Sequence, residues 1–87
     1  MQYFVYLIIS KKKNRLISYV GYTNNLAKRI KLHNEGKGAK YTRGKKWKII
    51  YFVEYPNKSM ALREEHKLKK NRKLRDFIKK INKKEVF

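Results

Sequence analysis

The sequence contains no cysteine, and its 87 residues include only 1 proline and 4 glycines. Without cysteine the chain can form neither a disulfide framework, nor a disulfide-linked partner, nor a thiolate zinc site. Acidic residues are also scarce, since 6 Asp plus Glu stand against 25 Lys plus Arg, for a net charge of +19. No apolar run is long enough to cross a membrane, and MQYFVYLIIS lacks the basic segment that precedes a signal-peptide core. We therefore expect a cytoplasmic protein without a membrane segment.

Apolar and aromatic residues are abundant, because 41% of the chain is hydrophobic and it holds 7 Tyr and 4 Phe. This content exceeds that of a disordered tail, and the length suits a single domain over residues 1–87. The charge predicts a polyanionic partner. Nucleic acid fits best, because Lys and Arg neutralise phosphates and release counterions. A ribosomal or membrane-surface role would also fit the charge.

Three stretches predict β-strands. Residues 3–9 are an unbroken apolar run rich in aromatic and β-branched side chains, typical of a strand covered on both faces. After a charged turn at 11–15, residues 16–20 predict a second strand that forms a hairpin with the first and ends at Gly21. Residues 47–55 predict the third strand.

A first helix is predicted from residue 25 to about 34. Thr23 or Asn24 would cap its N-terminus, because short polar side chains accept the free backbone N–H groups there. Leu26 and Ile30 lie four residues apart, so they share one face of this helix.

Two further helices follow the third strand. Ser59 can cap the second, which continues through Lys69 or Lys70, and the third covers 72–82. We expect an α/β fold: a small layered domain in which helices flank a three-stranded antiparallel sheet, in the order β-β-α-β-α-α. Residues 3–70 would form its core and 72–82 a basic C-terminal helix, whose inward-facing residues would be Phe77, Ile78 and Ile81.

Two side chains of the first predicted helix are candidates for chemistry. Arg29 and His33 are spaced i, i+4 and lie on the side of the apolar pair. An arginine beside an apolar stripe is partly desolvated, and its planar fork suits phosphate. In a purely structural interpretation Arg29 only extends along the core edge and His33 is a surface residue.

Glu65 is the corresponding candidate on the second predicted helix. It follows Ala61 by four residues and precedes Leu68 by three, so it faces the apolar side. An acid there needs a partner or a metal. One carboxylate can hold a hydrated Mg²⁺ that takes its other ligands from phosphate and water. The structural alternative is an ion pair with Lys69 or Arg29.

Two tyrosines of the predicted hairpin complete the set. Tyr6 alternates with Phe4 and Ile8, and Tyr19 shares a strand face with Ile17. In a suitable antiparallel register both hydroxyls would lie on one face of the sheet. Ordinary aromatic packing in the core is the alternative for each.

The tripeptides FVY (4–6) and YVG (19–21) precede Arg29, His33 and Glu65 in this order on a β-β-α-β-α pattern. This combination resembles the GIY-YIG endonuclease superfamily. More narrowly it is similar to the small stand-alone bacterial members, in which a stretch like GYTNNLAKRIKLHNEGKGAKYTRG is followed by a strand such as WKIIYFVEY and a helix such as SMALREEHKLKK. The resemblance covers residues 3 to about 70.

The sequence departs from the family pattern at three points. Phe4 stands where the first motif has glycine. The segment KKKNRLIS lengthens the hairpin connection, which would change the register of Tyr6 against Tyr19. The late asparagine of many members is matched by Asn82 or, less well, by Asn71.

The resemblance implies hydrolysis of phosphodiester bonds with one divalent metal, Mg²⁺ or Mn²⁺. Glu65 would ligate the metal, and Arg29 would stabilise charge on the scissile phosphate. Tyr6 and Tyr19 would position or deprotonate the attacking water, and His33 would assist proton transfer. A tyrosine base requires nearby cations that lower its pKa from about 10. The bacterial nucleoid would then be the location of the substrate.

Basic residues gather in the hairpin turn, in the loop at 34–46 and in the C-terminal segment LKKNRKLRDFIKKINKK. A charge run is often only a solvated face, but three such regions around a phosphate site suggest a binding channel of low sequence preference. The candidate nucleic-acid-binding residues are Lys40, Arg43, Lys45, Lys46 and Lys69.

Three functional hypotheses follow. The first is a metal-dependent DNA endonuclease of low sequence specificity, with a role in repair or recombination. The second is a non-catalytic nucleic-acid-binding protein, for RNA or the ribosome, which would not need Glu65 on an apolar face. The third, a peripheral membrane binder, would require apolar residues of the helix at 72–82 that the core uses. A double-strand break would require two visits or a dimer.

Overall fold

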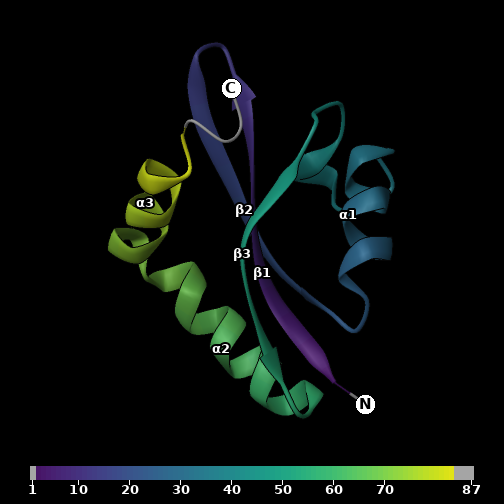
Figure 1. The fold of residues 1–87 in the computed structure, drawn as a ribbon. Helices are drawn as coiled ribbons and strands as arrows, with labels where there is room; N and C mark the ends of the chain where they lie inside the picture. The colour runs from purple at the N-terminus through teal and green to yellow at the C-terminus, as the bar shows by residue number, and fades with distance from the viewer. Residues whose placement is uncertain (1, 84–87) are drawn as a thin grey trace.

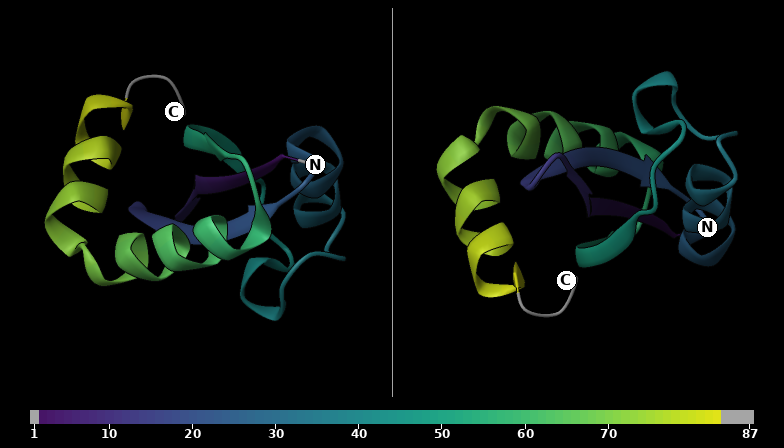
Figure 2. Two further views of the ribbon diagram at one scale, coloured as in Figure 1. Left: turned by 90° about the horizontal axis from the view of Figure 1, so that it is seen from below. Right: turned by 90° about the horizontal axis from the view of Figure 1, so that it is seen from above.

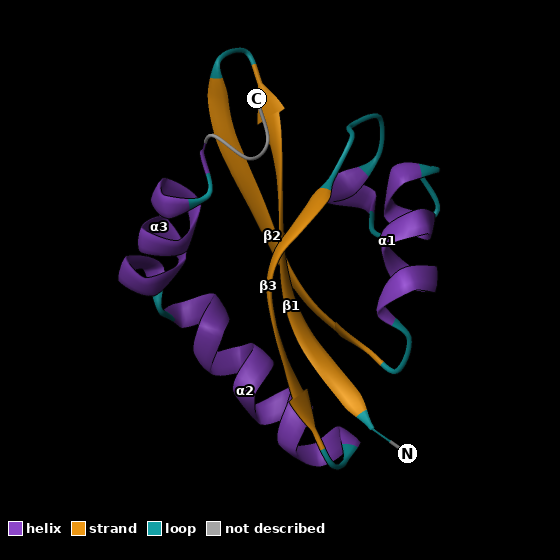
Figure 3. Ribbon diagram, in the orientation of Figure 1, coloured by secondary structure: helices purple, strands orange, loops and turns teal. Residues whose placement is uncertain are grey.

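The structure is a computed structural model that describes residues 2–83. Its elements follow the predicted order β-β-α-β-α-α along the chain. The strands of the antiparallel sheet lie in the order β2-β1-β3, so β1 is the central strand. Figures 1 and 3 show α1 on one side of the sheet and α2 and α3 on the other. None of the helices within 2–83 is long and apolar enough to cross a bilayer. The elements are β1 (Tyr3–Lys12), β2 (Arg15–Thr23), α1 (Leu26–Asn34), the short 3₁₀ helix η1 (Lys40–Thr42), β3 (Lys48–Tyr55), α2 (Lys58–Lys70) and α3 (Arg72–Ile81).

The β1–β2 hairpin is longer than the sequence pattern predicts. Its turn consists of Lys13 and Asn14, which have φ angles of 47° and 66°. Both angles are left-handed, as the tightest two-residue hairpin turns require. The prediction of a long charged connection is therefore wrong. Lys11 and Lys12 continue β1 and Arg15 begins β2, with their side chains in solvent. Gly21 does not end β2 either; it pairs with Tyr6 inside the ladder.

The sheet separates two apolar cores. Figure 2 shows the helices that cover its two faces, α1 on one and α2 and α3 on the other. Central strand β1 contributes to both, which explains why its apolar run does not alternate with polar residues. The core under α1 is built around Tyr6, Ile8 and Trp47. The core on the opposite face is built from Val5, Leu7, Val20, Ala61, Leu68 and Ile78.

Asparagines cap the helices one or two residues away from the predicted positions. Asn25, and neither Thr23 nor Asn24, caps α1 by accepting a backbone N–H at 3.0 Å. Asn57 caps α2 in the same way at 2.9 Å, in place of the predicted Ser59. All of these residues are competent caps, so propensity alone does not choose between neighbours.

Helix α3 covers less of the core than predicted. Ile78 is buried, but the side chains of Phe77 and Ile81 are 59% and 63% exposed. The expectation that all three face inward is therefore wrong for two of them. Phe77 precedes Ile78 by one residue, or roughly 100° around the helix, so a narrow contact cannot bury both.

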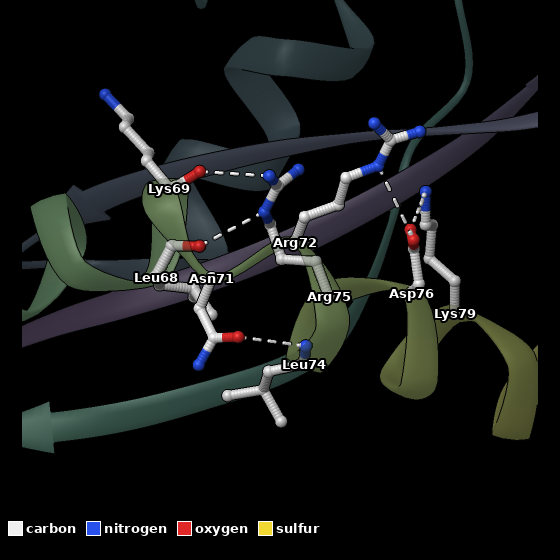
Figure 4. A network of polar contacts seen from close by, with 8 residues as sticks. All are labelled: Leu68, Lys69, Asn71, Arg72, Leu74, Arg75, Asp76 and Lys79. Carbon is white, nitrogen blue, oxygen red and sulfur yellow. Dashed lines mark hydrogen bonds and ion pairs between the residues drawn. The ribbon is translucent and has the colours of Figure 1, made fainter.

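The corner between α2 and α3 is fixed by side chains that bond to helix ends (Figure 4). Arg75 donates from Nε to the carbonyl of Leu68 at 3.1 Å and from Nη2 to the carbonyl of Lys69 at 3.0 Å. Asn71 accepts the backbone N–H of Leu74 at 3.1 Å and so caps α3. These bonds supply partners to backbone groups at the helix ends, in addition to the Asn71 N–H that the Leu68 carbonyl also accepts at 3.1 Å. Asn71, the weaker of the two asparagine matches to the family pattern, thus has a structural contact here. The other, Asn82, donates to the carbonyl of Ile78 at 2.8 Å at the C-terminal end of α3.

Candidate active site

The hydroxyl of Tyr6 is the centre of the candidate site. Tyr6 lies on central strand β1, is 1% exposed and faces Gly21 of edge strand β2. A methyl group at Gly21 would overlap the Tyr6 hydroxyl. The glycine therefore provides the space through which the hydroxyl reaches the edge of the sheet.

Helix α1 supplies two partners to this hydroxyl. Arg29 donates from Nε to the Tyr6 oxygen at 3.3 Å, and the Tyr6 hydroxyl lies 2.7 Å from His33 Nε2. The rings of Tyr6 and Tyr19 meet the His33 ring edge to face, with centroids 5.7 and 5.3 Å apart. Since His33 is 0% exposed, the interpretation of it as a surface residue is wrong. Two strands and one helix thus bring four of the candidate side chains together.

The segment after α1 folds back over His33 and closes the site. Thr42 of η1 is fully buried and lies 2.9 Å, through its hydroxyl, from His33 Nδ1. Trp47 anchors the segment by donating from Nε1 to the carbonyl of Thr42 at 2.9 Å. Asn34 at the end of α1 donates to the Trp47 carbonyl at 3.2 Å. The sequence predicted none of these contacts, because a loop without apolar periodicity has no pattern that indicates its folded path.

Burial controls the protonation of the site. It lowers the pKa of His33 to about 4, with a further contribution from the charge of Arg29, so the imidazole is neutral at pH 7. Burial also raises the pKa of Tyr6, which the hydrogen bond and charge of Arg29 only partly oppose. This direction is opposite to the one that a tyrosinate base requires. Tyr6 is thus a neutral phenol whose proton can leave only toward a bonded acceptor.

Folding stability will decrease as the pH falls from 7 to 5. The unfolded chain binds a proton on His33 near pH 6.5, whereas the folded chain resists it until about pH 4. The unfolded state therefore binds more protons between these values, which costs about 2 kcal/mol of unfolding free energy over this range. Urea titrations at several pH values will measure it. His33→Gln should flatten the pH dependence, and an equal slope in both proteins would contradict the assignment to His33.

Glu65 approaches from the opposite layer. It lies on α2, which packs against the other face of the sheet, and its side chain is 14% exposed. Its carboxylate is 3.6 Å from Lys69 Nζ, which is the ion pair predicted as the structural alternative. The charge of Glu65 is one of the causes that raise the pKa of Tyr6. Glu65 is therefore within electrostatic reach of the Tyr6 hydroxyl from across the sheet edge.

The acidic donors of the site suit only one kind of metal binding. Within residues 2–83, no three His, Asp or Glu side chains come together as a metal-binding group. Glu65 alone fits a hydrated Mg²⁺ or Mn²⁺ that takes its remaining ligands from substrate phosphate and water. Lys69 is half exposed, so its ion pair is weak and can yield to such a cation.

An open hollow of about 300 Å³ lies beside Arg29. Arg29 and Lys58 contribute two positive charges to its wall, and Tyr3, Tyr22, Thr23 and Asn24 complete it. Because Arg29 uses Nε for Tyr6, its terminal nitrogens are the ones that could bind a phosphate there. Lys58 precedes Glu65 by seven residues on one stripe of α2, roughly 10 Å along the axis. Lys58 is a candidate that the sequence pattern did not indicate.

The predicted nucleic-acid-binding residues lie on two sides of the sheet. Four follow α1 in the chain, and the fifth, Lys69, lies on α2. Lys45 is held by Tyr41, since its Nζ donates to the Tyr41 carbonyl at 3.1 Å and lies 5.4 Å from the ring centre. The Tyr41 ring is 52% exposed and stacks on Tyr19 of the site at 6.2 Å. On the far layer, Lys69 is engaged by Glu65. The remaining candidates, which are exposed in the segment after α1, are Lys40, Arg43 and Lys46.

Residues 2–82 match the family described as the GIY-YIG catalytic domain, and the chain belongs to this family. The match confirms the resemblance found in the sequence and indicates a nuclease-type domain that acts on nucleic acid. A UPF0213 protein of Oceanobacillus iheyensis is 42% identical over 69 residues, which span 78% of this chain and 77% of that protein. A UPF0213 protein of Clostridium perfringens is 50% identical over 66 residues, 75% of this chain and 70% of that one. The solution NMR structure of the UPF0213 protein BH0048 from Bacillus halodurans is 35% identical, covers 93% of this chain and 85% of its own, and has a TM-score of 0.49.

Proposed function

We propose that the protein is a metal-dependent endonuclease that hydrolyses phosphodiester bonds in DNA with low sequence specificity. The observation that carries the proposal is the buried Tyr6 hydroxyl, which lies between the cation of Arg29 and the neutral imidazole of His33. A core tyrosine that only packed would not need both a charged donor and a basic nitrogen at one oxygen.

The proposed reaction is attack of water on phosphorus, in which one ester P–O bond breaks and the leaving oxygen takes up a proton from solvent to become a free hydroxyl. The Tyr6 oxygen accepts a proton from the attacking water while its own proton passes to His33 Nε2, so tyrosinate never has to exist alone. Arg29 stabilises the charge that grows on the phosphate oxygens. Tyr19 packs against His33 and holds the ring in place. A metal bound through Glu65 would supply Lewis acidity at the phosphate and orient the water.

The charge distribution supports DNA as substrate without favouring a sequence. The three basic regions contact phosphates, which give affinity and a steep salt dependence but do not distinguish bases. A role in repair or recombination would use the same surface on branched DNA. RNA binding without turnover is the competing outcome, and the test below separates the two.

Supercoiled plasmid incubated with Mg²⁺ or Mn²⁺ tests the proposal directly. We expect nicking that EDTA abolishes. Glu65→Gln should lower the rate about 100-fold at low metal concentration, with partial recovery in excess Mn²⁺, because the lost ligand weakens metal binding. Gel quantification of nicked plasmid against time provides the rates.

Glu64→Gln is the matched control for this variant. Glu64 is the adjacent carboxylate on α2 and pairs with Lys67 at 3.2 Å. The Glu64→Gln protein should nick plasmid at the rate of the unchanged protein. Equal rates for Glu65→Gln and the unchanged protein would exclude Glu65 as the metal ligand. Salt-sensitive binding without cleavage of plasmid, branched DNA or structured RNA would instead support a binding protein.

A further inference from the structure

The hydrogen-bonded chain that begins at Arg29 does not end at His33. Beyond the imidazole, Nδ1 lies 2.9 Å from the hydroxyl of Thr42, which is fully buried. The same hydroxyl donates to the carbonyl of Ala39 at 2.9 Å and accepts the backbone N–H of Ala39 at 3.2 Å. The Thr42 hydroxyl therefore makes three polar contacts, and the proposed reaction uses none of them.

These contacts determine where each proton lies. A hydroxyl has one hydrogen and two acceptor lone pairs, and a carbonyl can only accept. The hydrogen of Thr42 is thus used on the Ala39 carbonyl, so Thr42 must accept its remaining bond from His33 Nδ1–H. A neutral imidazole has one N–H, which leaves Nε2 bare and able to accept from Tyr6. Arg29 Nε can only donate, so the Tyr6 oxygen accepts there while its proton points to His33.

We propose that Thr42 is a positioning residue that fixes His33 in the Nδ1-protonated tautomer and thereby directs the Tyr6 proton away from the substrate. In the other tautomer Nε2–H would point at the Tyr6 oxygen. The phenol would then turn its own proton outward and could not accept one from water. The consequence for catalysis rests on the proposed function; the assignment of the tautomer does not.

The surroundings of Thr42 keep this arrangement in one geometry. The side chain also bonds across the first turn of η1, and Trp47 holds the Thr42 carbonyl. Gly38 lies against the other side of the imidazole, where any added methyl group would overlap Nδ1. Gly38 and the rings of Tyr6 and Tyr19 confine the imidazole, so it cannot rotate to exchange its nitrogens without opening the loop.

The test compares Thr42→Val, which keeps the shape without the hydroxyl, with Thr42→Ser, which keeps the hydroxyl. Long-range ¹H–¹⁵N correlation NMR at pH 7 should show protonated Nδ1 and bare Nε2 for His33 in the unchanged protein and in Thr42→Ser. Thr42→Val should shift the proton to Nε2. In the plasmid assay the kcat of Thr42→Val should fall about 100-fold with DNA binding retained. With the proton of His33 on Nε2, the Tyr6 oxygen can no longer accept a proton from the attacking water.

Each outcome is decisive. An Nε2-protonated His33 in the unchanged protein would overturn the inference, and this measurement does not depend on whether Thr42→Val folds. A Thr42→Val protein with the switched tautomer and an unchanged kcat would overturn the positioning role. The predicted tautomers without nicking by any variant would support the assignment of the tautomer and count against the nuclease instead.

Discussion

Arg29→Ala is expected to lower the metal-dependent nicking rate at least about 1,000-fold while plasmid binding changes little. One preorganised donor at a developing oxyanion contributes about 100- to 1,000-fold, and Arg29 supplies both a full charge and a fork of donors. The same change removes the donor to the Tyr6 oxygen, so the phenol loses orientation as well. Binding depends on many other cations spread over the surface. The measurement is nicking kinetics beside a salt-dependent binding titration.

Two further variants separate charge from geometry at this position. Arg29→Lys keeps the charge but not the planar fork, so it should recover no more than about 10-fold. Lys28→Ala removes the adjacent exposed cation of α1 and should leave the rate unchanged. Cleavage by Arg29→Ala within tenfold of the unchanged protein would exclude transition-state stabilisation by Arg29. Loss of the thermal unfolding transition would show that Arg29 is needed for folding.

Gly21→Ala is expected to cost about 3 kcal/mol of unfolding free energy, the largest stability effect among these predictions. Its new methyl group would overlap the hydroxyl and ring of Tyr6, which the core holds on every other side. The ring must shift, which breaks its bond to His33 and leaves a buried nitrogen without a partner. Urea unfolding at pH 7 measures the loss, and the His33 NMR signals should move with it.

Gly36→Ala is the matched control for this steric effect. Within residues 2–83, apart from Gly36 and its two chain neighbours, no atom lies within 4 Å of the position that its methyl group would take, but its φ of +77° is left-handed. Only backbone strain of about 1 kcal/mol is therefore expected. A second comparison is the double variant Gly21→Ala with Tyr6→Leu. Its loss of unfolding free energy should be well below the sum of the two single losses, because leucine has no ring or hydroxyl for the new methyl group to overlap. A Gly21→Ala protein as stable as Gly36→Ala would contradict the steric account.

The sequence predicts the layered fold because its strongest signals are local. The apolar run of β1 indicates a strand buried on both faces, and the spacing of Leu26 and Ile30 indicates the inward stripe of α1. Hairpin register is a different matter. The cations around Lys13 have no buried face to indicate their pairing, so a charged loop and a charged strand extension give the same pattern. Only the two-residue turn at Lys13 and Asn14 fixes the register.

The candidate site was predictable in part for the same reason. Tyr6 and Tyr19 follow strand alternation, and Arg29 and His33 follow helical spacing, so their shared location follows once the elements pack. Thr42 belongs to a segment without periodicity, and its contact with His33 depends on the path of the whole loop.

Helix α3 was predicted correctly as a helix, but the extent of its burial was not. Its pattern identifies an apolar stripe but not how much of the stripe a neighbouring layer covers, as exposed Phe77 and Ile81 demonstrate.

Local opening of the loop between α1 and β3 would change the environment of His33 in the candidate site. Apart from η1 it has no regular structure, and side-chain bonds from Asn34, Thr42 and Trp47 hold it closed. Segments of this kind open at a lower free energy than the sheet they cover. An opened loop would leave the strands and α1 in place but expose His33 to water and free its ring. The fraction of molecules with a competent base is then set by the opening equilibrium of one loop, well before the domain unfolds.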